Sequence, residues 1–283
     1  MVHTRGVRLH AATAGSADHP LILLLHGACG AWFDWRDILL PLADCGYHVA
    51  AVDMRGYGLS DHPAGRFDYD LHGTVGDITG VIRSLGHDSA TLIGEGSGGA
   101  VAWTVASKYP AMVDSLISIG AIHPADLRRL RFTQPWTVFP PIPGLLPPAL
   151  WRRGVPSAGA YRRNLVASTH ARFHDDYRFE EYLSLRLAEL APERPRPAVK
   201  SNIELVWAKV PSEQYRRPID APVTLIHPGG PGWEVQEDRA RRRTRETFRS
   251  VHIPDTELLP HIEDPGAFLD AIVPALGMRL RHS

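Results

Sequence analysis

Cysteine, long apolar runs and an excess of one charge are all scarce in this sequence. Its 283 residues include two cysteines, Cys29 and Cys45, which are too few for a disulfide framework. Basic and acidic residues number 31 each, so no overall charge attracts nucleic acid or an anionic membrane. The longest apolar run, Leu21–Leu25, is far too short to cross a bilayer. We therefore expect neither a nucleic-acid partner nor a membrane span.

Signals for export and for cofactors are also missing. The first ten residues contain no apolar segment of the secretory kind, and with so little cysteine the default expectation is a cytoplasmic protein. The 15 histidines include no closely spaced ligand set such as H-E-x-x-H. Neither a dinucleotide-binding nor a phosphate-binding glycine loop stands in the required context. The sequence accordingly predicts no metal and no other cofactor.

Apolar segments of strand length alternate with segments of helical periodicity. The strand-like segments are Val7–Ala14, Pro20–His26, Tyr47–Val52, Val113–Ile119, Val223–His227 and Val251–Pro254. The segments with helical spacing include Trp32–Leu42, Leu71–Leu85 and Pro265–Leu276. This alternation predicts an α/β fold with a doubly wound, mostly parallel sheet covered by helices on both faces.

Ligands of such sheets bind at the carboxyl ends of the strands. Four loops begin at that edge of the predicted sheet, at His26, Asp53, Gly94 and Gly120. We expect these loops to converge on one site.

Residues 123–220 differ in character from the sequence on either side. A proline-dense stretch, Pro135–Pro148, precedes three segments of helical pattern, at Ala158–Ser168, Tyr177–Leu190 and Val199–Val210. We predict a mostly helical cap over residues 123–220, inserted into an α/β core of residues 1–122 and 221–283. Arg and Lys outnumber Asp and Glu in the cap, and Arg239–Arg245 is also basic. Both features are more typical of solvated helix faces than of binding patches.

The segment Ala90–Ala106 contains a sharp turn between a strand and a small-residue helix. It passes through Gly94, Glu95, Gly96, Ser97 and Gly98. This is the shape of a nucleophile elbow, in which flanking glycines let backbones approach closely and lift one side chain above the sheet. The residue at the nucleophile's position is Gly96, which has no side chain.

Further motifs stand in a fixed order around this turn. They are His26-Gly27 after a buried strand, the segment D-M-R-G-Y-G-L-S at Asp53–Ser60, His123-Pro124 before the cap, and P-H-I-E-D-P at Pro260–Pro265. Together with the elbow they resemble the α/β-hydrolase family over almost the whole chain. Within that family the chain looks most like the branch of epoxide hydrolases and haloalkane dehalogenases.

The resemblance implies three catalytic groups on three loops. A nucleophile stands at the elbow, a carboxylate follows the strand after the cap, and a histidine lies on the last loop. In this chain those positions carry Gly96, Pro231 and Leu258, and Glu257 replaces the glycine that usually precedes the histidine. We therefore predict a degenerate triad and no standard hydrolysis, as in a pseudoenzyme.

Other residues are weighed as substitutes and as pocket residues. Glu95, Ser97 and His261 are the candidate substitutes, although a packing role for Glu95, a helix-start role for Ser97 and a structural role for His261 are the commoner uses. The resemblance implies an oxyanion hole made by the backbone N–H groups of Ala28 and Ser97. The predicted pocket residues are His26, Gly27, Ala28, Cys29, Gly96, Ser97 and Leu258.

Three hypotheses for function follow. The first is a protein that binds a small hydrophobic molecule in a capped pocket without hydrolysing it. The second is an enzyme with a rebuilt site (hydrolase, lyase, isomerase or cyclase) that uses Glu95, Ser97 or His261. The third is a protein-interaction role through the cap, with its arginine pairs Arg152-Arg153 and Arg162-Arg163.

Cap tyrosines assist ring opening in epoxide hydrolases, and the candidates here are Tyr161, Tyr177, Tyr182 and Tyr215. The sequence leaves a homodimer open.

Overall fold

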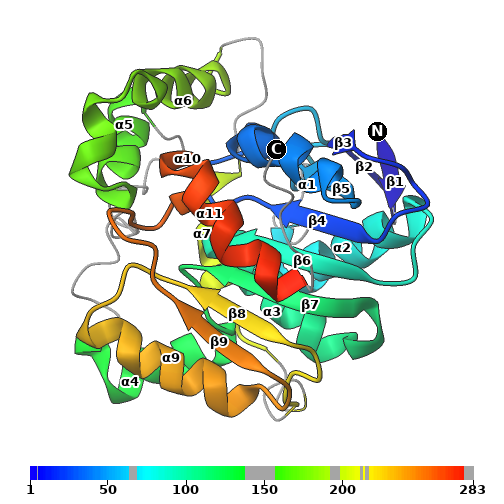
Figure 1. Ribbon diagram of the computed structural model, residues 1–283. Coiled ribbons are helices and arrows are strands. Elements are labelled where there is room, and N and C mark those ends of the chain that lie inside the picture. The colour runs from blue at the N-terminus through cyan, green and yellow to red at the C-terminus, as the bar shows by residue number, and fades with distance from the viewer. Residues whose placement is uncertain are drawn as a thin grey trace.

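A seven-stranded sheet forms the centre of the molecule. The computed structural model describes residues 1–4, 6–63, 69–137, 157–191, 198–210, 213 and 217–276. The sheet has the order β3-β5-β4-β6-β7-β8-β9 and every neighbouring pair is parallel except β3 with β5. Its strands are β3 (Ala11–Ala14), β4 (Leu21–Leu25), β5 (His48–Val52), β6 (Ala90–Glu95), β7 (Val113–Ile119), β8 (Val223–Ile226) and β9 (Phe248–Val251). The predicted doubly wound, mostly parallel α/β fold is confirmed (Figure 1).

Two predicted strands differ clearly from those observed, and three others, Pro20–His26, Tyr47–Val52 and Val223–His227, are shorter by one or two residues. The segment Val7–Ala14 is divided at His10 into β2 (Val7–Leu9), which pairs with β1 (Val2–Thr4), and β3 of the large sheet. The division occurs because the His10 N–H donates to the Ser60 hydroxyl, at 2.9 Å, instead of to a strand. The last strand is Phe248–Val251 instead of Val251–Pro254, because its partner β8 ends at Ile226, opposite Val251.

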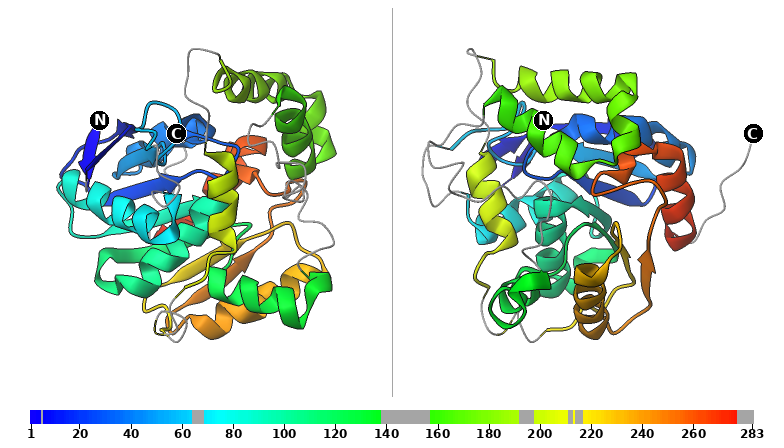
Figure 2. Two further views of the ribbon diagram at one scale, coloured as in Figure 1. Left: turned by 180° about the vertical axis from the view of Figure 1, so that it is seen from behind. Right: turned by 90° about the vertical axis from the view of Figure 1, so that its left-hand side faces the viewer.

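Helices cover both faces of the sheet. The side chains of β4 alternate between the two faces. Leu21, Leu23 and Leu25 pack toward α2 (Leu71–Ser84) and α3 (Gly96–Lys108). Ile22 and Leu24 pack toward α1 (Arg36–Asp44) and α11 (Pro265–Ile272). All five residues of β4 are buried, which explains its continuous apolar run. Figure 2 shows α2 and α3 side by side on the face opposite α1 and α11.

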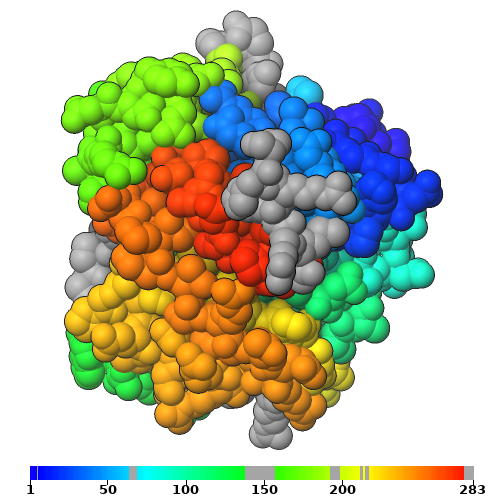
Figure 3. All heavy atoms as spheres, viewed as in Figure 1, coloured from blue at the N-terminus to red at the C-terminus, as the bar shows by residue number. Residues whose placement is uncertain are grey.

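The described residues between β7 and β8 form helices and turns. They are α4 (Pro124–Thr133), η4 (Pro135–Thr137), α5 (Ala158–Ser168), η6 (Ala171–Asp175), α6 (Tyr177–Ala188) and α7 (Val199–Val206). The helices α5 and α6 form a lobe that lies against α1 and against α10 (Pro260–Glu263), as the space-filling view shows (Figure 3). By contrast, α4 packs beside α9 (Pro231–Arg243). Most of the proline-dense stretch, from residue 138 onward, lies outside the described residues. The division into core and cap stays a prediction.

Side-chain caps explain where several helices begin. The Asp70 carboxylate accepts the Gly73 N–H at 2.6 Å at the start of α2, and the Asp176 carboxylate accepts the Arg178 N–H at 2.9 Å at the start of α6. No helix within the described ranges is both long and apolar enough to cross a membrane.

The elbow is held by close contact between backbones. A Cβ atom placed on Gly98 would lie 2.3 Å from the carbonyl oxygen of Leu25 and 2.6 Å from that of His26. Glycine at this position therefore lets the first turn of α3 rest directly on the end of β4, next to β6.

We expect Gly98→Ala to lower the free energy of unfolding by about 3 kcal/mol or more, because backbone atoms cannot move aside as a flexible side chain does. Urea unfolding followed by circular dichroism measures this. The matched control is Gly159→Ala in α5, where the nearest atom to the new Cβ is the Arg163 Nη1 at 3.3 Å. That variant should keep its stability or gain up to about 1 kcal/mol, and equal losses in both variants would contradict the argument.

Candidate functional site

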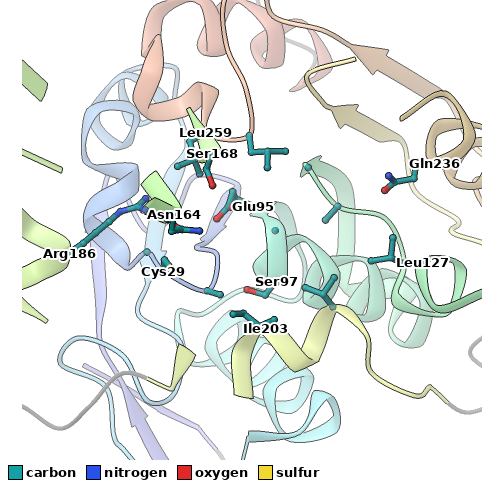
Figure 4. Close-up of a pocket in the computed structure, with 17 residues that line it drawn as sticks. Cys29, Glu95, Ser97, Leu127, Asn164, Ser168, Arg186, Ile203, Gln236 and Leu259 are labelled. Atoms are coloured by element: carbon teal, nitrogen blue, oxygen red, sulfur yellow. Dashed lines mark hydrogen bonds between the residues drawn. The ribbon is translucent and has the colours of Figure 1, made fainter. Parts of the chain in front are cut away.

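A cavity of about 80 Å3 lies at the carboxyl ends of β4, β6 and β7, beneath the cap helices (Figure 4). Its apolar wall is formed by Ala28, Ala121, Leu127, Ile203, Val206, Leu258 and Leu259. Its polar side chains are Glu95, Ser97, Asn164, Ser168, Arg186 and Gln236, and Cys29, Gly30, Gly96 and Gly120 complete the lining. The cavity is large enough to hold a small ligand or several waters.

The turn at Gly96 keeps the geometry of a nucleophile elbow. Gly96 has φ of +52°, in the left-handed region that residues with side chains rarely adopt. A Cβ placed there would meet only the Gly27 Cα, at 3.9 Å, among the described atoms. The position above the turn is therefore open to a side chain that this sequence does not supply.

Leu258 forms the wall opposite the loop that follows β7. Its Cδ2 lies 2.9 Å from the point where a Cβ of Gly120 would stand, and Gly120 has φ of +61°. The Leu258 N–H donates to the Ser168 carbonyl of α5 at 3.1 Å. The structure thus brings Gly96 and Leu258 to one cavity.

Pro231 is placed elsewhere. Pro231 is the first residue of α9. Proline is favourable there because a backbone N–H at this position would have no acceptor within the helix. Gly230 before it has φ of +94°. Pro231 is absent from the lining formed by the described residues, but Gln236, further along the same helix, reaches the cavity.

Glu95 is the carboxyl group of the cavity. A Cβ on Gly27 would lie 1.8 Å from its Oε2, so only glycine leaves room for this carboxyl group. Burial raises the pKa of Glu95 to about 8, and the negative charge of Asp34 adds to the effect; Arg186 and the Gly27 N–H oppose it. Glu95 therefore keeps its proton at neutral pH and can donate a hydrogen bond.

Arg186 reaches the cavity from α6 and forms a buried ion pair. Its Nη2 lies 3.1 Å from the Asp34 Oδ2, and the two side chains are 2% and 1% exposed. A Cβ on Gly30 would lie 1.9 Å from the same oxygen, so this glycine makes room for Asp34. Burial raises the pKa of Asp34, and Arg186 opposes that rise. Burial also raises the pKa of Cys29 to about 12, so this thiol stays protonated and is a poor nucleophile.

Two fully buried side-chain atoms of the cavity lining, one nitrogen and one oxygen, lack hydrogen-bond partners among the residues that the structure describes. One is the Oγ of Ser97, a side chain 2% exposed on the first turn of α3. The other is the Nε of Arg186. Buried donors without acceptors are unfavourable, so they indicate where a ligand or water binds.

His26 and Gly27 support the cavity from outside its lining. The His26 Nδ1 donates to the Gly27 carbonyl at 2.7 Å, and the Nε2 accepts the Met54 N–H at 3.0 Å. Burial lowers the pKa of His26, so the ring is neutral and joins the loops after β4 and β5. Ala28 and Cys29, the next two residues, do line the cavity.

His261 lies in the core, away from the cavity lining. Its ring stacks on Trp35 with centroids 4.2 Å apart and meets Phe268 edge-on at 5.9 Å. Neither ring nitrogen has a hydrogen-bond partner in the described part of the chain, and burial lowers the pKa of His261 to about 3. This placement gives the ring a packing contact and no path to a bound molecule.

The cap tyrosines do not line the cavity within the described ranges. Tyr161 is buried among apolar residues, Tyr182 donates to the Asp37 carboxylate at 2.8 Å, and Tyr177 is 80% exposed. Tyr215 lies outside the described residues, as do Arg152 and Arg153. Arg162 pairs with Glu180 at 2.8 Å on the surface of α5 and α6.

Sequence reasoning missed most of the cavity's polar side chains, Arg186 above all. A usable signal was present: Phe179, Tyr182, Leu183 and Arg186 recur with the spacing of one helix face. The first three are buried, so the same face carries Arg186 into the interior. An arginine on an apolar stripe predicts a buried acidic partner, here Asp34.

The model of the family described as alpha/beta hydrolase fold matches residues 20–227. The chain belongs to this family. Among curated proteins, it is 46% identical over 123 residues to the AB hydrolase superfamily protein YfhM of Bacillus subtilis, a match that covers 44% of this chain and 43% of that protein. It is 41% identical over 138 residues to epoxide hydrolase 1 of Caenorhabditis elegans, covering 49% and 34%. Each match spans less than half of the relative's own length.

Solved structures of epoxide hydrolases share the fold over nearly the whole chain. Epoxide hydrolase A from Mycobacterium thermoresistibile superposes with a TM-score of 0.74 and 22% identity, covering 99% of this chain and 98% of that one. The epoxide hydrolase VrEH1 from Vigna radiata gives 0.75 and 18%, covering 98% and 96%. The predicted resemblance to the epoxide-hydrolase-like branch of α/β-hydrolases is confirmed.

The ion pair of Arg186 with Asp34 should show strong thermodynamic coupling. Arg186→Met leaves the Asp34 charge buried and unpaired, and we expect a loss of about 3–5 kcal/mol in the free energy of unfolding. The double variant Asp34→Asn/Arg186→Met should lose much less. The control cycle uses the exposed pair of Arg242 and Asp238, 73% and 50% exposed, where coupling should stay below about 0.5 kcal/mol. Similar coupling in both cycles would contradict the burial of the first pair.

The low pKa of His261 predicts a specific pH dependence of stability. The pKa of His261 is about 3 in the folded protein and about 6.5 in the unfolded chain. Between these two pH values the imidazole is protonated only when the chain is unfolded. Stability is therefore fully present above pH 6.5 and is lost as pH falls toward 3. We expect His261→Phe, which keeps the stack on Trp35, to lose stability less steeply than the wild type between pH 7 and 4, by a few kcal/mol in all. Urea unfolding at several pH values measures this, and parallel curves for the two proteins would refute it.

Proposed function

We propose that this protein binds a small molecule in the cavity beneath its cap and does not hydrolyse it by the nucleophile–histidine–acid mechanism of its family. The observation that carries the proposal is the elbow itself: Gly96 keeps the left-handed turn and the open space above it, but offers no attacking atom. Leu258 forms an apolar wall, and Pro231 begins a helix. Removal of such a triad lowers the rate on the order of a million-fold in a serine hydrolase.

The character of the lining supports ligand binding. Apolar side chains from the core and from α7 surround a few polar groups, which is the usual composition of small-molecule sites. The relatives named epoxide hydrolases share this fold, so a ligand of comparable, partly apolar chemistry suits the proposal.

A second candidate function is acid–base catalysis by Glu95. The carboxyl group lines the cavity, and its pKa of about 8 suits proton transfer near neutral pH. An isomerase, lyase or hydrolase reaction of that kind needs no nucleophile at Gly96. A turnover that titrates near pH 8 and disappears in Glu95→Gln would favour this candidate over ligand binding alone.

Replacing Gly96 tests the elbow directly. Aspartate tolerates left-handed backbone better than most residues, so Gly96→Asp should fold. We expect its carboxylate oxygen to bond to a carbon of styrene oxide while the ring C–O bond breaks and the released oxygen takes a proton from water. The product is an ester adduct heavier than the protein by one whole epoxide, and intact-mass spectrometry detects it.

Controls separate this outcome from others. Gly96→Asn has nearly the same size without a nucleophilic carboxylate and should form no adduct, and the wild type should neither form an adduct nor turn over styrene oxide or 4-nitrophenyl butyrate. The Gly96→Asp adduct should persist, because Leu258 cannot activate water. Wild-type turnover that a cavity substitution such as Ile203→Trp abolishes, but the exposed Val166→Trp does not, would overturn the proposed function.

A further inference from the structure

Two buried polar atoms of the cavity lining have no partner among the described residues, and both can donate a hydrogen bond. The unpartnered atoms are the Arg186 Nε, which is a donor only, and the Ser97 hydroxyl, which can donate. Both side chains are 2% exposed and both line the cavity. Figure 4 shows Arg186 extending from α6 toward Asn164 and Glu95, with Ser97 on the floor of the same space. A ligand that satisfies these atoms must present acceptors.

We propose that the ligand is a small monocarboxylate, whose oxygens accept hydrogen bonds from the Arg186 guanidinium and the Ser97 hydroxyl. This inference rests on the proposed ligand-binding function and names the chemistry of its ligand.

Arg186 retains donors after its protein contacts are made. The Arg186 Nη2 donates to the Asp34 Oδ2 at 3.1 Å. Its Nη1 lies 3.5 Å from the Asn164 Oδ1, which is at the upper limit for a hydrogen bond. Arg186 thus makes a single hydrogen bond to Asp34 and not the bidentate pair that a guanidinium can form with a carboxylate. The Nε donor remains for a second oxyanion, and hydrogen bonds to charged groups are the stronger kind inside proteins.

A bound carboxylate would lie beside a guanidinium that Asp34 already pairs. Because Asp34 offsets the charge of Arg186 and Glu95 keeps its proton, the ligand's charge would be stabilised by hydrogen bonds from Arg186 and Ser97 and by no net positive charge of the lining. Ser97 lies on the first turn of α3, a 13-residue helix whose N-terminal end carries partial positive charge. The carbon chain of the ligand would face Leu127, Ile203 and Val206 on the apolar side.

Glu95 makes the affinity depend on pH. The charged or titratable groups that act on it are Asp34 and Arg186, and it acts in turn on Cys29 and Tyr57, which both stay protonated. Above pH 8 the Glu95 carboxyl group ionises and repels a carboxylate ligand. The affinity should therefore fall by up to tenfold per pH unit above this point, and Glu95→Gln, which stays neutral and still donates, should have a flat profile.

Isothermal titration with ligands of one chain length tests the inference. We expect butyrate to bind the wild type at pH 6.5 at least about tenfold more tightly than butyramide. Ser97→Ala should weaken butyrate about two- to tenfold. Arg186→Met should abolish the preference for the carboxylate; because this variant can misfold, the double variant Asp34→Asn/Arg186→Met, with its folding checked by circular dichroism, provides the same test. Arg242→Met, on the exposed face of α9, is the control and should bind as the wild type does.

The outcomes separate the two proposals. Butyramide binding as tightly as butyrate would overturn the carboxylate inference and leave ligand binding in place. A carboxylate preference that persists in both Arg186 variants would also overturn it. Failure of butyrate, benzoate and their amides to bind would count against both proposals. Release of butyrate from 4-nitrophenyl butyrate by the wild type would overturn the non-hydrolytic function alone.

Discussion

The buried ion pair between Arg186 and Asp34 is the interaction on which the site depends. It joins α6 to the turn that begins at Trp32, and two further contacts reinforce it: Tyr182 with Asp37, and Arg36 with Glu181. A buried charge on Arg186 or Asp34 without its partner would be strongly destabilising. The pair therefore holds α6 in place over the carboxyl ends of the strands. The same guanidinium opposes the upward shift in the pKa of Glu95 and of Cys29.

Small residues around the elbow give the pair its place. Gly27 and Gly30 stand on one loop, and each leaves room for a carboxyl group, Glu95 and Asp34 respectively. In this family such a loop supports a reactive centre, and here it supports two buried acids and one cation. The loop thus places three buried charged or titratable groups beside the elbow.

The sequence predicted the scaffold better than the site. Val113–Ile119 and Ala158–Ser168 have the bounds expected from periodicity, because local pattern and burial agree there. The elbow at Gly96 followed from glycine spacing, which is also local. The cavity's polar side chains did not follow, since the contact of Arg186 with Asp34 joins residues 152 positions apart. Only the packing of α6 against the loop after β4 creates this contact, and neither residue belongs to a recognisable motif.

The helices between β7 and β8 also show how small the entropic cost of inserted chain is in this fold. Strands β7 and β8 are hydrogen-bonded neighbours, yet the whole of α4 to α7 is inserted between them. The entropy lost in closing such a loop grows only with the logarithm of its length, so doubling an insertion costs about 0.6 kcal/mol. The free energy of pairing β7 with β8 therefore depends only weakly on the length of the chain between them. An insertion of another length would therefore change the helices over the cavity while the strands beneath keep their register.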